Sequence, residues 1–213
     1  MPRVLALLLL FACLDEGLAQ PVRAADASTA AQVDAAMVLP EALRKALEAR
    51  KPKPGLTAEE RVQRLVDFMV ADDGLALRYQ EQPTLGIAES HAQRKVNCLS
   101  FTLMFIALAR ASGMQAHAQA SDDALAMRVL DDTVYRATHV NAGVEIRGME
   151  YTVDVGWRSL LAVRKPRTIS DAQAVALLHN NNAVERLLQK DFAQAASEIG
   201  IALALDPANP VVW

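Results

Sequence analysis

The chain has 213 residues, of which 52% are hydrophobic and 22% are charged, and its net charge is −3. This composition is typical of a globular protein with a sizeable core, and it excludes a disordered chain or a solvated coiled coil. The small negative charge, without a basic run or an aromatic platform, argues against nucleic acid or an anionic membrane surface as a partner.

Residues 1–19 are predicted to be a signal peptide. Arg3 supplies a short positive region, and residues 4–12 form an apolar stretch too short to span a bilayer. A second processing route stays open, because Leu-Phe-Ala-Cys at residues 10–13 loosely resembles a bacterial lipobox in which Cys13 is lipidated. We therefore expect a periplasmic or secreted protein, attached to a membrane only if Cys13 carries a lipid.

Residues 20–55 are predicted to be a tether with one short helix. Residues 20–39 are low in complexity and are expected to form a loose connection, whereas residues 40–50 have helical spacing and begin with Pro40 in the first turn. The Pro-rich residues 51–55 end this helix.

The main domain is predicted to span residues 56–165. Thr57 and Glu60 form a capping box that opens a helix. Its apolar residues follow helical spacing: Val62, Leu65, Val66 and Met69. Residues 75–89 are expected to be irregular.

Cys98 lies at the start of a predicted buried helix that Gly113 ends. The residues between them are apolar or small apart from Arg110, and a helix that is apolar on all sides is buried. At a helix N-terminus the free N–H groups and the dipole favour an anion such as a thiolate. After export Cys98 is the one remaining cysteine, so it is either a buried small hydrophobe or a reactive thiol.

The chain then changes to strand-like alternation. Residues 114–120 are predicted to be a strand, residues 121–126 a polar break, and residues 127–135 a weak strand or a loop. The clearest β signal is an antiparallel hairpin of residues 138–146 and 149–155 around the turn Arg147-Gly148.

This hairpin brings a histidine and a carboxylate together. With Arg147-Gly148 as the turn, Asn141 lies opposite Asp154, and His139 lies on the same face as Asn141. His139 and Asp154 are then diagonal neighbours within reach of each other. Each alone is an ordinary polar residue, but with Cys98 they supply the nucleophile, base and orienting group of a thiol acyl-transfer triad.

Other polar residues give weaker indications. The remaining histidines, His91, His117 and His179, lack the spacing of metal ligands. No metal or organic cofactor is predicted. Asn97 and Asn141 either orient groups in the site or are ordinary polar residues. The backbone N–H of Cys98 is a plausible oxyanion donor. The second donor is not identifiable, and Gln80 and Gln82 are no better supported than other loop glutamines.

The sequence from Asn97 to Gly113, together with Thr138-His139-Val140 and Tyr151-Thr-Val-Asp154, resembles the transglutaminase-like superfamily of papain-fold cysteine enzymes. The resemblance covers roughly residues 56–163. It implies an α+β fold in which a central cysteine-bearing helix packs on an antiparallel β-sheet. It also implies Cys98 as nucleophile, His139 as general base and Asp154 as orienting residue.

Residues 162–167 are predicted to be a linker, and residues 170–213 a helical hairpin broken at residues 189–191, whose first helix starts at Ser170 or nearer residues 180–182. Residues 183–213 resemble a tetratricopeptide repeat. The matching positions are Phe192, Ala195, Ala202 and Asp206-Pro207. One repeat is too few to stand alone, so it either docks on the catalytic domain or binds another chain, or is simply an ordinary hairpin.

The sequence therefore predicts an exported cysteine enzyme that transfers acyl groups, most simply by hydrolysing a peptide or amide in a peptide or protein substrate. The alternative is a non-catalytic module that binds a peptide or protein through a degenerate domain, with the repeat as a docking surface. Fold resemblance fixes neither the substrate nor the choice between hydrolysis and cross-linking.

Overall fold

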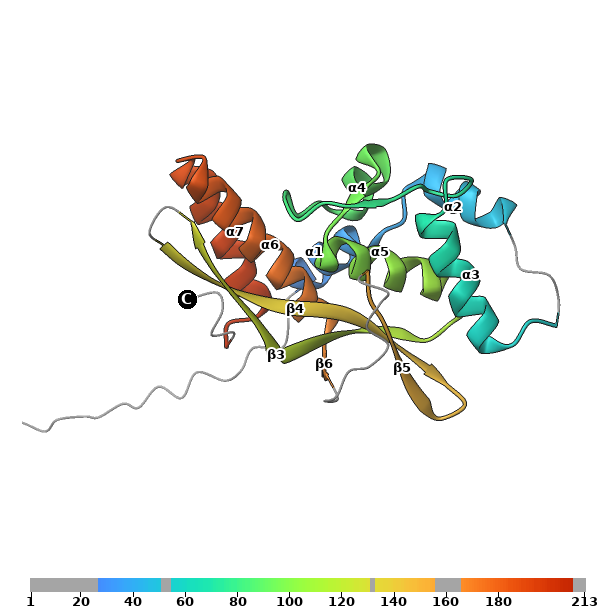
Figure 1. Ribbon diagram of the computed structural model, residues 1–213. Helices are drawn as coiled ribbons and strands as arrows, with labels where there is room; N and C mark the ends of the chain where they lie inside the picture. Colours follow the sequence, from blue (N-terminus) through green and yellow to red (C-terminus); the bar gives the residue numbers. More distant parts are fainter. Residues whose placement is uncertain (1–26, 51–54, 131–132, 156–165, 209–213) are drawn as a thin grey trace, which may run out of the picture.

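Figure 1 shows the computed structural model, which describes residues 27–50, 55–130, 133–155 and 166–208. The described residues combine helices with an antiparallel sheet, as expected for an α+β protein, and the helices gather on one side of the sheet. The predicted signal peptide, Cys13 and residues 162–165 of the predicted linker lie outside the described residues. None of the described helices has the length and apolar character needed to cross a membrane.

Helix α5 (Cys98–Ala111) is the centre of the hydrophobic core. Its residues from 99 to 109 are all buried, which confirms the prediction of a helix packed on every side. It ends in a Schellman motif, in which Gly113 adopts a φ of +74° and the N–H of Met114 donates to the carbonyl of Ala109. The predicted stop at Gly113 is thus confirmed, and its cause is the left-handed backbone that glycine adopts without strain.

The main sheet has four antiparallel strands in the order β5-β4-β3-β6. The strands are β3 (Ala116–Leu130), β4 (Thr133–Ile146), β5 (Met149–Val153) and β6 (Arg167–Ile169). Helix α5 packs on β3 and β4. Alternate residues of β4, including Val140, Ala142 and Val144, join the same core as α5, so one face of the sheet is buried against this helix.

The predicted hairpin register is confirmed. Ile146 pairs with Met149, and Ala142 pairs with Val153, with Arg147 and Gly148 both at positive φ in the turn. A two-residue turn with positive φ at both positions matches the right-handed twist of the strands. The register therefore puts the odd-numbered residues of β4 and the even-numbered residues of β5 on one face.

The strands before this hairpin are longer than predicted. Strand β3 continues through residues 121–126, where a polar break was expected, but the pairing with β4 shifts register between Ser121 and Ala126. The polar residues thus mark a β-bulge rather than the end of a strand. The predicted linker also ends earlier than expected, because Arg167 begins β6, which pairs with β3 at the edge of the sheet.

The N-terminal helices cover the core. Helix α2 (Glu41–Ala49) follows Pro40 and buries Leu43, as predicted. Helix α3 (Ala58–Val70) begins with the predicted capping box of Thr57 and Glu60. The prediction of a loose tether is wrong for helix α1 (Ala27–Met37), which contacts α5 and α6. Its alanines have high helix propensity, and their small side chains allow close packing.

Residues 75–96 also contain short elements, although residues 75–89 were expected to be irregular. Helix α4 (Ile87–Gln93) leads into a parallel pair formed by β1 (Arg78–Tyr79) and β2 (Lys95–Val96). Two-residue strands leave too short a pattern for sequence periodicity to reveal. This pair anchors residues 80–86 next to the start of α5.

The C-terminal segment is the expected helical hairpin. Helix α6 (Asp171–Leu188) begins at Ser170, which forms a capping box with Gln173, so Ser170 is the start that the sequence left open. Helix α7 (Phe192–Leu205) packs on α6 after the predicted break at residues 189–191. The hairpin also contacts α1, α5 and β3 through α6.

Candidate active site

Cys98 is the first residue of α5, the position that the sequence predicts. Asn97 is the N-cap, and its side-chain oxygen accepts the N–H of Ser100 at 2.9 Å. Asn97 is buried, whereas Cys98 is half-buried and carries a free thiol. The thiol therefore stands at the positive end of the helix dipole, beside backbone N–H groups that no helical carbonyl satisfies.

His139 and Asp154 are in direct contact, as the hairpin register predicts. The Nε2–H of His139 donates to the Oδ2 of Asp154. His139 belongs to β4, and Asp154 follows the last residue of β5. The carboxylate fixes which ring nitrogen faces it, so the other nitrogen, Nδ1, is the one left for a second partner.

The thiol of Cys98 is the other side chain that acts on the ring. The hydrogen bond to Asp154, followed by a hydrogen bond to Cys98, raises the pKa of His139 from 6.5 to about 10, while burial of the ring acts in the opposite direction. The charges of both partners add to the increase. The structure thus brings all three predicted residues together, because the imidazole interacts with both the carboxylate and the thiol.

At neutral pH, an imidazole with this pKa carries two N–H groups and a positive charge. A cation next to a cysteine at a helix N-terminus is the environment in which reactive thiolates occur in proteins. Chemically, the arrangement can present a sulfur nucleophile and hold a proton next to it.

The side chain of Gln80 is not placed as an oxyanion donor would be. The Nε2 of Gln80 donates to the backbone carbonyl of Gln82 at 2.5 Å, so its amide is turned back on its own loop. The structure adds no support for Gln80 or Gln82 as the second donor.

Asn141 lies between the predicted triad and a second polar cluster on the same face of the sheet. It is 5% exposed, pairs with Gln119 across the strands, and its Oδ1 has no hydrogen-bond partner among the described residues. The structure therefore does not show Asn141 orienting Cys98 or His139.

The second cluster contains His117, one of the histidines that the sequence left without a role. Glu150 Oε1 accepts from Nε2 of His117 at 2.6 Å and from Nε2 of Gln119, and the hydroxyl of Thr152 donates to Gln119 Oε1 at 3.2 Å. The cluster lies directly over Gly143, whose missing Cβ leaves the space that these groups occupy. It links β3 to β5 across β4, beside the site.

The two other histidines lie elsewhere. His91 belongs to α4, and His179 of α6 bonds to Glu198 of α7 at 2.6 Å. Within the described ranges, no three His, Cys, Asp or Glu side chains are grouped so as to hold a metal ion.

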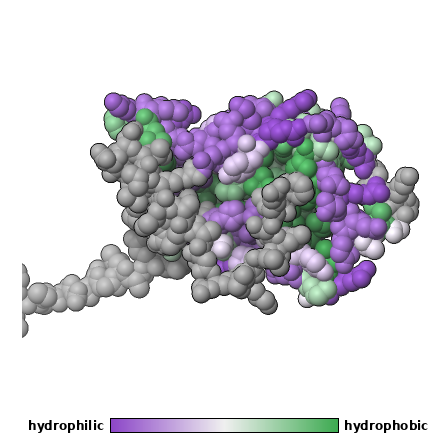
Figure 2. Space-filling view, viewed as in Figure 1, coloured by the Kyte–Doolittle hydropathy of each residue, from purple (hydrophilic) through white to green (hydrophobic). Residues whose placement is uncertain are grey.

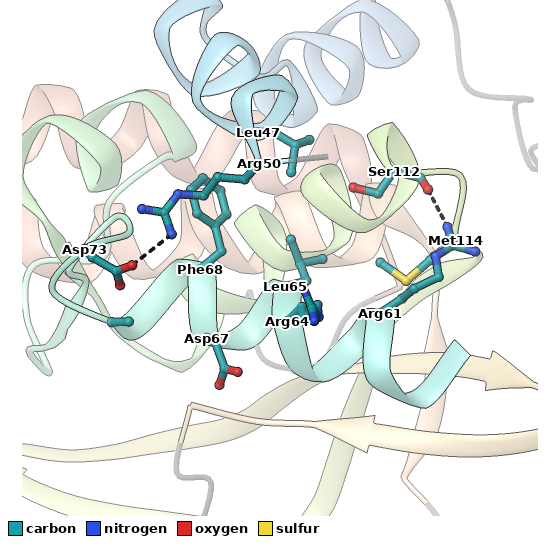
Figure 3. A pocket seen from close by; sticks show the side chains of 11 residues that line it. Leu47, Arg50, Arg61, Arg64, Leu65, Asp67, Phe68, Asp73, Ser112 and Met114 are labelled. Atoms are coloured by element: carbon teal, nitrogen blue, oxygen red, sulfur yellow. Dashed lines mark hydrogen bonds and ion pairs between the residues drawn. The ribbon is translucent and has the colours of Figure 1, made fainter. Parts of the chain in front are cut away.

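A cavity of about 390 Å³ opens at the other end of α5 (Figure 3). Its apolar lining includes Leu65 and Phe68, and its charged lining includes Arg50 and Arg61, whose guanidinium donates to the carbonyl of Ser112 at 2.6 Å. Because Ser112 caps the end of α5 and Cys98 starts it, this cavity is separate from the candidate active site.

The site also uses residues that the sequence analysis missed. Thr84 is buried beside Asn97, and Glu185 of α6 accepts the N–H of Thr84 at 2.6 Å. A loop threonine and a helix glutamate have no pattern that links them across such a separation, so no sequence signal was available.

Comparison with known proteins identifies no family. No family model and no curated protein matches the chain. One similar solved structure, from Cytophaga hutchinsonii, carries the description "putative cysteine protease", with 16% identity and a TM-score of 0.43. The match covers 65% of this chain and 46% of that one, so this chain spans less than half the length of its neighbour. A likeness of this degree carries no conclusion about activity.

Proposed function

We propose that the protein is an exported transglutaminase-like cysteine enzyme that hydrolyses a peptide or amide through Cys98. The observation that supports the proposal is the hydrogen bond of His139 to Asp154, together with the interaction of the same ring with Cys98 at the start of α5. A buried structural cysteine would need neither an imidazole nor a carboxylate.

In the first half-reaction, the Cys98 sulfur attacks the amide carbonyl carbon and forms a thioester. The C–N bond breaks, and His139 gives its proton to the leaving amine. In the second half-reaction, water attacks the thioester carbonyl carbon while His139 takes a proton from the water. The C–S bond then breaks, which releases a carboxylic acid and restores the Cys98 sulfur as a thiolate beside the protonated His139. Asp154 keeps the imidazole oriented and stabilises its positive charge throughout.

The backbone N–H of Cys98 supports stabilisation of the transition state. It is one of the first N–H groups of α5, which have no carbonyl partner within the helix, so it can donate to the carbonyl oxygen as that oxygen develops charge. An amine in place of water in the second step would give cross-linking instead of hydrolysis, and the chemistry up to the thioester is the same.

The test is the rate of alkylation of Cys98 by iodoacetamide as a function of pH. An unperturbed thiol titrates near about 8.5. We expect the wild type to react rapidly well below this pH, and His139→Ala to lose this fast reaction, with Cys98→Ser as the unlabelled control. If the wild type and His139→Ala share the same ordinary profile, the triad assignment is wrong.

Hydrolysis of peptide amides, with and without amine acceptors, would then show whether water or an amine attacks the thioester. The products separate water from amine attack, because only an amine acceptor leaves a new amide bond.

A second candidate is a binding module that uses the helical hairpin, as a single tetratricopeptide-like repeat, for its docking surface. It is favoured by exposed apolar side chains at the outer end of the hairpin, where Figure 2 shows hydrophobic surface: Leu187, Leu188 and Phe192. Binding does not require an ionised thiol, so an ordinary alkylation profile for Cys98 would favour this candidate.

A further inference from the structure

Helix α6 is connected to the start of α5 through one buried residue, Thr84. The carboxylate of Glu185 accepts the backbone N–H of Thr84 at 2.6 Å and also bonds to its side chain. The hydroxyl oxygen of Thr84 accepts from Asn181 at 3.3 Å and from Asn97 at 2.8 Å. Thr84 is 6% exposed, so these bonds are largely shielded from water.

The same segment is fixed to the first turn of α5 at a second point. Ser100 Oγ donates to the carbonyl of Leu85 at 2.7 Å and accepts its N–H at 3.0 Å. Asn97 and Ser100 lie on either side of Cys98 in sequence, and Asn97 caps the helix by accepting the N–H of Ser100. The position of the thiol therefore depends on where Thr84 and Leu85 are held.

The carboxylate of Glu185 is costly at this position. Burial raises the pKa of Glu185, whereas the two hydrogen bonds from Thr84, and the charge of neighbouring Arg186, lower it. A buried carboxylate without such donors destabilises a fold. The donors of Thr84 thus compensate Glu185, and Glu185 in turn satisfies an N–H that would otherwise be buried without a partner.

We propose that Glu185 is a positioning residue for Cys98, acting from the C-terminal hairpin through Thr84 and Asn97. This inference rests on the proposed function for its catalytic meaning. It assigns the hairpin a role in the catalytic domain that is distinct from docking a partner. Figure 1 shows α6 beside the N-terminal end of α5, and the two helices are in contact.

The test compares Glu185→Leu, Glu185→Gln and a matched control, Glu198→Gln. Glu198 is a half-buried carboxylate of the same hairpin that bonds to His179 and does not contact Thr84. The wild type and the three variants are assayed for amide hydrogen exchange, for alkylation of Cys98 by iodoacetamide at pH 7, and for thermal unfolding.

We expect Glu185→Leu to speed exchange at residues 84–85 and 98–100 by roughly tenfold to a hundredfold, as the loss of a hydrogen bond to a charged group implies. Alkylation of Cys98 should slow by several-fold in the same protein. Glu185→Gln keeps an oxygen acceptor and should restore most of both properties. Glu198→Gln should lower the melting temperature without changing either.

The inference is overturned if exchange at residues 98–100 is the same in Glu185→Leu and the wild type, or if Glu198→Gln changes it equally. If Glu185→Leu does not fold, Glu185→Gln and Asn181→Ala answer the same question with milder changes. The exchange measurement does not depend on catalysis. An ordinary alkylation profile in the wild type would refute the proposed function alone.

Discussion

Asp154→Asn is the substitution that most directly tests the electrostatics of the site. The hydrogen bond to Asp154 is the largest of the effects that raise the pKa of His139 from 6.5 to about 10. Asparagine has nearly the same shape but no charge, so it removes the charge-assisted bond without opening a cavity. An opposite charge in contact typically shifts a pKa by about 1–3 units, and we expect the pKa of His139 to fall by that amount toward 6.5.

The assay is a titration of the histidine ring signals by NMR in wild type and variant. In the wild type we also expect the alkaline limb of any amide hydrolysis near pH 10, because His139 must carry the proton that the leaving amine receives. In Asp154→Asn this limb should move to lower pH.

The stability of the fold should also depend on pH through the protonation of His139. The folded state raises the pKa of His139, so its contribution to the free energy of unfolding is fully present below pH 6.5 and is lost as the pH rises through about 10. Asp154→Asn should flatten this slope between pH 7 and 10 in urea unfolding. A wild-type His139 that titrates near 6.5, or a variant with an unchanged pKa, would refute the account of the site given above.

Three further substitutions test the fold around the site. Gly143→Ala places a Cβ 2.6 Å from Glu150 Oε1, and we expect a loss of about 1–3 kcal/mol in the free energy of unfolding from the broken polar cluster, measured in urea. Thr57→Ala removes the capping box with Glu60 and should cost about 1 kcal/mol in the same assay, with a stability unchanged from wild type as the contrary result. Gly113→Ala strains a φ of +74° at the end of α5 and should cost roughly 1–2 kcal/mol in the free energy of unfolding, whereas a neutral effect would mean that the turn relaxes.

The sequence predicted those parts of the fold whose pattern is local and repeated. Helix α5 is apolar along most of its length, so its position was identified from the sequence. The hairpin of β4 and β5 alternates around a two-residue turn, so its register was also identified. Because the register fixes which residues share a face, the contact of His139 with Asp154 followed from the turn at Arg147-Gly148.

The parts that escaped prediction depend on contacts between distant segments. Helix α1 consists mostly of small and polar residues, and its structure depends on packing against α6. The bulge near Ser121 resembles a chain break in sequence, because both interrupt the alternation. The link from Glu185 to Thr84 joins residues far apart in the chain, and no periodicity records such a pair.

The two-residue turn of the β4–β5 hairpin has a consequence for how the site tolerates insertions and deletions. A single residue added within either strand would move His139 or Asp154 to the opposite face of the sheet and separate them. Residues inserted between Arg147 and Gly148 would leave the pairing intact, because that turn is at the far end of the hairpin from Asp154. Length changes in homologous chains should therefore concentrate at this turn, where an odd or an even number of added residues leaves the strand pairing unchanged. The strands should keep a fixed length between the turn and the pair His139 and Asp154.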